Sequence, residues 1–113
     1  MFSFLKKVLG LENDVDFAAL VAEGAQIVDV RTPEEFQGGH IKNAVNIPLQ
    51  VLSHKLSAIR QDKAVIVCCA SGVRSSSAKG ILLSNGFSIV HNGGGWRGLQ
   101  GKLTRTFHPI SER

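Results

Sequence analysis

The stretch that most restricts the fold of this chain is Ala64-Val-Ile-Val-Cys68, which is apolar throughout and rich in β-branched residues. Such a run is typical of a β-strand buried on both faces, as in a parallel sheet covered by helices. The chain has 113 residues, the usual size of one domain, and 43% of them are hydrophobic. We therefore expect one α/β domain that needs no disulfides to hold its core.

Short strands alternate with helices along the rest of the chain. Strands are predicted at residues 26–30, 44–47, 64–68 and 87–90, and helices at 14–24, 32–38, 49–60, 75–85 and from Trp96 onward. Asp14 is the predicted cap of the first helix, and residues 91–95 are predicted to be a loop. This alternation predicts an α/β fold with a central parallel β-sheet and helices on both faces.

Residues 1–13 are interpreted as an N-terminal amphipathic segment, and residues 14–113 as the domain. Lys6 and Lys7 interrupt the apolar stretch of this segment, unlike the charge order of a secretory signal peptide. We expect it to pack on the domain, and a weak contact with a membrane surface or a partner is the alternative. No apolar run approaches the roughly 20 residues of a membrane-spanning helix, so membrane insertion is not expected.

The chain carries a net charge of +4, but Lys6-Lys7 is its only adjacent basic pair. The charge therefore favours small anions over nucleic acid, and an ordinary solvated surface explains it equally well. The two cysteines are neighbours, and a disulfide between them would be strained. Reduced thiols are typical of the cytoplasm, where we expect the chain to be a monomer.

The candidate site lies where the most apolar strand ends, because ligands of open α/β sheets bind beyond the carboxyl ends of the strands. Cys68 continues the strand, whereas Cys69 begins a loop that leads into a helix. Backbone N–H groups of such a loop and the helix dipole stabilise a thiolate. We therefore predict that Cys69 is the nucleophile and that Cys68 is a core residue. The two lack the spacing and further ligands of a zinc site.

The length of this loop separates two kinds of cysteine chemistry. From Cys69 to Arg74 the pattern is Cys-x4-Arg, one residue shorter than the Cys-x5-Arg loop of cysteine phosphatases and arsenate reductases. A shorter loop forms a smaller cradle, which suits one additional sulfur atom better than a tetrahedral anion. Gly72 allows the tight turn and Arg74 adds a cation; the other predicted members of the cradle are Ala70, Ser71 and Val73.

Several roles are open to the charged residues near the site. Asp29 ends a predicted strand, so it either hydrogen-bonds the loop, orients Arg74 or is purely structural. Arg31 is expected to form a local ion pair with Glu34 or Glu35. The four histidines are scattered and indicate no partner base for the cysteine, and His40 is interpreted as structural.

Four stretches, in order, resemble the rhodanese family. They are residues 29–36 (Asp-Val-Arg-Thr-Pro-Glu-Glu-Phe), Gly39-His-Ile41 with Asn46-Ile-Pro48, residues 65–69 with Gly72-Val-Arg-Ser75, and Gly93-Gly-Gly-Trp96. Each motif is weak alone, but together they cover residues 14–102. The resemblance implies a rhodanese-like fold and a sulfurtransferase with Cys69 in the catalytic position.

In that family the cysteine takes sulfane sulfur from a donor such as thiosulfate or a persulfide. It then passes the sulfur to cyanide or a thiol, without a cofactor or a metal, so we expect none. A sulfur carrier or regulatory binding module with little turnover of small molecules is the second hypothesis, with a sulfur-relay protein as its partner. A small cysteine phosphatase or arsenate reductase is the third, and the Cys-x4-Arg spacing opposes it.

Overall fold

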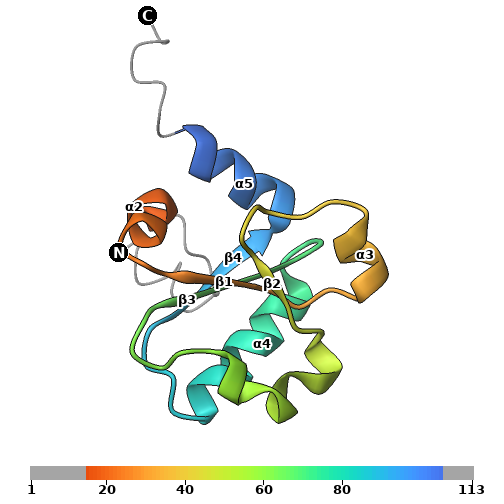
Figure 1. The fold of residues 1–113 in the computed structure, drawn as a ribbon, viewed down its shortest axis with the longest axis vertical. Helices are drawn as coiled ribbons and strands as arrows, with labels where there is room; N and C mark the ends of the chain where they lie inside the picture. The colour runs from red at the N-terminus through yellow and green to blue at the C-terminus, as the bar shows by residue number, and fades with distance from the viewer. Residues whose placement is uncertain (1–14, 106–113) are drawn as a thin grey trace, which may run out of the picture.

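The computed structural model describes residues 15–105, so the predicted N-terminal segment and Asp14 lie outside the described residues. Within this range the centre is a parallel four-stranded sheet with the order β2-β1-β3-β4 (Figure 1). Its strands are β1 (Gln26–Asp29), β2 (Val45–Asn46), β3 (Val65–Cys69) and β4 (Val90–Gly95). The predicted parallel sheet is therefore confirmed.

Helices cover both faces of this sheet, as predicted (Figure 1). One face carries α2 and α5, and the other carries α4 and two short 3₁₀ helices. The bounds are α2 (Phe17–Ala22), α3 (Pro33–Gln37), η1 (Leu49–His54), η2 (Leu56–Ala58), α4 (Val73–Ser84) and α5 (Trp96–Arg105).

Successive side chains of β3 point into two separate cores. Val65, Val67 and Cys69 pack with α4 and the 3₁₀ segment, whereas Ile66 and Cys68 pack with α2 and α5. All five residues have 0% of their surface exposed, as the apolar run predicts for a strand covered on both sides. The alternation sends the two cysteines to opposite faces of the sheet.

The helix predicted at residues 49–60 is wrong. The segment forms η1 and η2, which are separated at Lys55, where the backbone leaves helical geometry (φ −125°, ψ 22°). Its apolar side chains are nevertheless buried or half-buried in the core between the sheet and α4, as their spacing predicts. They are Leu49, Leu52, Leu56 and Ile59. Their burial against the sheet does not require a continuous helix.

The strand predicted at residues 87–90 lies further along the chain. Phe87 is buried, and its N–H donates a hydrogen bond to the Leu82 carbonyl in the turn that ends α4. Strand β4 instead includes the glycines that were expected to form a loop. Pairing with β3 skips Gly93, because Val67 lies opposite Asn92 and Cys68 lies opposite Gly94. A Cβ on Gly93 would lie 2.8 Å from Leu99 and 2.9 Å from Ile66, so this strand requires glycine where it crosses the core.

Two helix starts also differ from prediction. The cap of α2 is Asp16, whose Oδ1 accepts a hydrogen bond from the Ala19 N–H at 3.0 Å. Helix α4 begins at Val73, two residues early, because Gly72 adopts a left-handed conformation (φ 104°) and turns the chain directly into the helix. The loop after Cys69 is correspondingly tight.

Candidate active site

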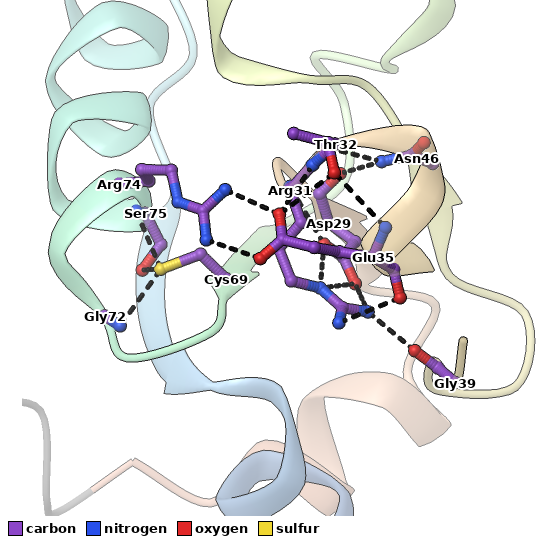
Figure 2. Close-up of polar contacts among 10 residues, drawn as sticks. All are labelled: Asp29, Arg31, Thr32, Glu35, Gly39, Asn46, Cys69, Gly72, Arg74 and Ser75. Carbon is purple, nitrogen blue, oxygen red and sulfur yellow. Dashed lines mark hydrogen bonds and ion pairs between the residues drawn. The ribbon is translucent and has the colours of Figure 1, made fainter. Parts of the chain in front are cut away.

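The loop after β3 wraps around the Cys69 sulfur, as Figure 2 shows. The Gly72 N–H donates a hydrogen bond to Sγ at 3.0 Å, and the Ser75 N–H donates another at 3.4 Å. The Ser75 hydroxyl also lies 3.4 Å from Sγ. Donors from the turn and from the first turn of α4 therefore converge on one sulfur atom.

These donors make Cys69 more acidic than an ordinary cysteine. Burial of the sulfur raises its pKa, but its hydrogen bond with the Ser75 hydroxyl and those from the backbone N–H groups of Ser75, Gly72 and Ser71 lower it further than burial raises it. The net effect is a lowered pKa. The site is thus suited to hold a thiolate in a dry environment.

Ser75 and Asn92 extend this network, and the sequence alone did not indicate either role. The Ser75 hydroxyl donates to Asn92 Oδ1 at 2.7 Å, and the same oxygen accepts the Gly94 N–H at 2.9 Å. The Asn92 amide donates to the Gly72 carbonyl at 3.3 Å, which ties β4 to the loop after Cys69. The position of Ser75 in the first turn of α4 was the available signal, whereas Asn92 comes from a stretch that was predicted to be a loop.

Cys68 lies in a different environment. Its side chain is fully buried in the core beneath α2 and α5. Burial, followed by the nearby charge of Asp29, raises the pKa of this thiol to about 12. Cys68 is therefore a protonated core residue at neutral pH, and its predicted place in the core is confirmed.

Arg74 lies beside the loop and binds a carboxylate 39 residues earlier in the chain. Its Nη1 and Nη2 donate to the two oxygens of Glu35 at 2.7 and 3.0 Å (Figure 2). Hydrogen bonds from Arg74 and then from the Thr32 backbone lower the pKa of Glu35 to about 2. The pair links α3 to α4 and is about one-third exposed on each side.

Glu35 is held in place by its own helix. Its Oε1 accepts the Thr32 N–H at 2.9 Å, and the Thr32 hydroxyl accepts the Glu35 N–H at 3.2 Å. This reciprocal pair is a capping box at the start of α3. The carboxylate that meets Arg74 is therefore also held by contacts within its own helix.

Asp29 does not orient Arg74, because its carboxylate is occupied by Arg31. The Arg31 guanidinium donates to both Asp29 oxygens, with the shortest contact at 2.7 Å, and both side chains are buried. The predicted ion pair of Arg31 with Glu34 or Glu35 is wrong: Arg31 reaches Glu35 only at its backbone carbonyl. These contacts favour the structural role among those considered for Asp29.

Glycines of β4 form a close wall behind the loop. A Cβ on Gly95 would lie 2.8 Å from the Ala70 carbonyl oxygen, which is closer than a side chain allows. A Cβ on Gly72 would lie 3.4 Å from Gly94 Cα, an ordinary contact, so it is the positive φ of Gly72 (104°) that favours glycine there. The cradle is thus enclosed by backbone from both sides.

Comparison with known proteins agrees with this geometry. The family model for the rhodanese-like domain matches residues 14–102. The chain belongs to the rhodanese-like family.

Two bacterial proteins are similar to this chain in sequence. A Bacillus subtilis protein, the uncharacterized protein YqhL, is 45% identical over 80 residues, covering 70% of this chain; the chain spans only 64% of YqhL. The thiosulfate sulfurtransferase PspE of Escherichia coli is 38% identical over 94 residues, or 81% of this chain and 88% of PspE.

A solved structure agrees with the fold. A structure described as a rhodanese with anions from E. coli is 35% identical and superposes with a TM-score of 0.63, covering 66% of this chain and 91% of that one. Between residues 15 and 105, no helix has the length and apolar character that crossing a membrane requires.

Proposed function

We propose that this chain is a sulfurtransferase that carries sulfane sulfur as a persulfide on Cys69. The observation that carries the proposal is the set of N–H and hydroxyl groups around Sγ, which lowers the pKa of this thiol alone. The name of PspE supports the reaction class, and the proposal requires reduced thiols, as found in the cytoplasm.

The proposed reaction has two steps, each a displacement at sulfur. The Cys69 thiolate attacks the outer sulfur of the donor; the S–S bond of the donor breaks, and the remainder leaves with the electron pair as sulfite or a thiolate. An acceptor thiolate or cyanide then attacks the outer sulfur of the Cys69 persulfide and restores the thiolate. Neither step needs a general base once the thiolate is formed.

The hydrogen-bond donors that hold the thiolate are also suited to the persulfide. When the outer sulfur is attacked, negative charge returns to Sγ, where the Gly72 and Ser75 N–H groups already point. Because these donors are backbone groups in a tight turn, they need little reorganisation during the reaction.

Mass spectrometry of the intact protein after incubation with thiosulfate or a small persulfide tests the proposal. We expect the wild type and Cys68→Ala to gain one sulfur atom and Cys69→Ser to gain none. Sulfur uptake by Cys69→Ser that is lost in Cys68→Ala would contradict the assignment.

Turnover separates the enzyme from a carrier protein. Val73 is 73% exposed beside the site, an apolar contact that favours a protein partner as donor or acceptor. Rapid, repeated transfer from thiosulfate to cyanide indicates an enzyme for small molecules. Stoichiometric loading without turnover, followed by transfer to a protein thiol, indicates a carrier.

A further inference from the structure

The cation of the catalytic loop is neutralised in this structure. The loop residues between Cys69 and Arg74 are Ala, Ser, Gly and Val, so Arg74 is the only basic side chain in the Cys-x4-Arg stretch. Both of its terminal nitrogens are directed at Glu35, at 2.7 and 3.0 Å (Figure 2). The Arg74–Glu35 pair therefore presents no net charge to an anion approaching Cys69.

This neutralisation is built into the fold. Glu35 is fixed by the Thr32 N–H, so its carboxylate remains facing Arg74 through the capping box of α3. The other arginine drawn in the site, Arg31, is neutralised in the same way by Asp29. Two cations near the site are thus each matched by one carboxylate.

The charge of the donor makes this arrangement selective. Thiosulfate brings two negative charges to a thiolate that already carries one, whereas a persulfide anion brings one. Coulomb repulsion scales with the product of the charges, so an available cation benefits thiosulfate twice as much in free energy as it benefits a persulfide.

We propose that Glu35 is a specificity-determining residue: by neutralising Arg74 it disfavours dianionic donors such as thiosulfate and favours persulfides of thiols. This inference rests on the proposed sulfur transfer through Cys69. For a persulfide anion, the Cys69 thiolate takes the outer sulfur, the donor S–S bond breaks and the donor leaves as a thiolate. The total charge of −2 is the same before and after the step.

Rates of sulfur loading on Glu35→Gln test the proposal. Glutamine retains an oxygen that can accept the Thr32 N–H, so the helix start is preserved while one negative charge is removed. The two donors are thiosulfate and the persulfide of 2-mercaptoethanol, whose only charge lies at the reacting end. At low salt we expect loading by thiosulfate to rise about fivefold and loading by the persulfide about twofold, as for a unit charge at roughly 8 Å.

Two control variants separate charge from structure. Glu34→Gln removes the same charge from the neighbouring exposed position of α3, and we expect it to change the thiosulfate-to-persulfide rate ratio much less. Glu35→Asp keeps the charge and alters the geometry, so both rates are free to change, but their ratio stays close to that of the wild type. At about 0.5 M salt the advantage of Glu35→Gln should shrink because the charges are screened.

The outcomes distinguish the proposal from the function on which it rests. If the wild type gains no sulfur from either donor, the proposed function fails and this inference fails with it. If the wild type gains sulfur but Glu35→Gln changes both rates equally, only the role of Glu35 is overturned.

Discussion

Cys68 and Cys69 are chemical neighbours on one strand, yet their environments differ in nearly every respect except exposure. Both side chains are completely buried. Cys68 faces the core of α2 and α5 and has its pKa raised to about 12 by burial and then by Asp29. Cys69 faces α4, and hydrogen bonds that outweigh its burial lower its pKa. Hydrogen-bond donors, rather than contact with solvent, thus separate a thiol with a lowered pKa from one with a raised pKa.

Alkylation should show the largest difference between the two cysteines. At pH 8 a thiol with a pKa of about 12 is about one part in 10,000 thiolate, so iodoacetamide should modify Cys69 and leave Cys68 nearly untouched. Mass spectrometry of the folded Cys68→Ala and Cys69→Ser variants measures each thiol separately. In concentrated urea both should react, and equal rates in the folded variants would refute the comparison.

Removing the Ser75 hydroxyl should raise the pKa of Cys69 toward that of Cys68. The hydrogen bond with the Ser75 hydroxyl lowers the pKa of Cys69, so Ser75→Ala should raise that pKa. We expect sulfur loading at neutral pH to fall several-fold and to recover at alkaline pH as the thiolate forms. Ser76→Ala, at the adjacent exposed position, is the matched control, and an unchanged pH profile in Ser75→Ala would exclude this role.

A methyl group at Gly95 should disturb the loop on the Cys69 side alone. Its Cβ would lie 2.8 Å from the Ala70 carbonyl oxygen, so we expect Gly95→Ala to cost about 1–3 kcal/mol and to slow sulfur loading. A Cβ on Gly98, in α5, meets nothing within 4 Å, so Gly98→Ala should leave loading unaltered and stabilise the helix by up to about 1 kcal/mol. Urea unfolding and loading rates measure both effects, and similar behaviour of the two variants would contradict the close approach.

The smallest expected effect is the response of the Glu35–Arg74 link to acid. The pKa of Glu35 is about 2 in the folded protein and 4.5 ordinarily, so the unfolded chain takes up the proton first as pH falls. Stability from this pair is complete above about pH 4.5 and is lost as pH approaches 2. The unfolding temperature of Glu35→Gln should therefore decline less than that of the wild type between pH 5 and 2.5; parallel curves would show that the pair does not contribute.

The sequence predicts the strand and loop that hold Cys69 better than it predicts the distant residues that contact them. The apolar run at 65–69 is sufficient to predict the central strand, and the Cys-x4-Arg count and Gly72 predict the tight loop that follows. Both features are local, so residues that are close together in the sequence are sufficient to predict them. That Cys69 acts as the nucleophile remains a prediction.

The contacts that sequence reasoning missed join residues far apart in the chain. Glu35 meets Arg74 across 39 positions, and Ser75 meets Asn92 across 17. The role of Asn92 was also missed because β4 is rich in glycine, which is generally depleted in strands. Here the crowded core requires glycine at position 93. Local patterns contain no information on which distant charge Arg74 meets.

The close contact between Gly95 and the loop has a consequence for how such a site changes over time. The outline of the cradle depends on main-chain N–H groups and on Gly95, where a Cβ would lie 2.8 Å from the Ala70 carbonyl oxygen. Ala70, Ser71 and Val73, by contrast, project from the rim and are exposed. Descendants of this chain can therefore replace the rim residue by residue and recruit new partners, while the hollow that holds the sulfur is inherited intact.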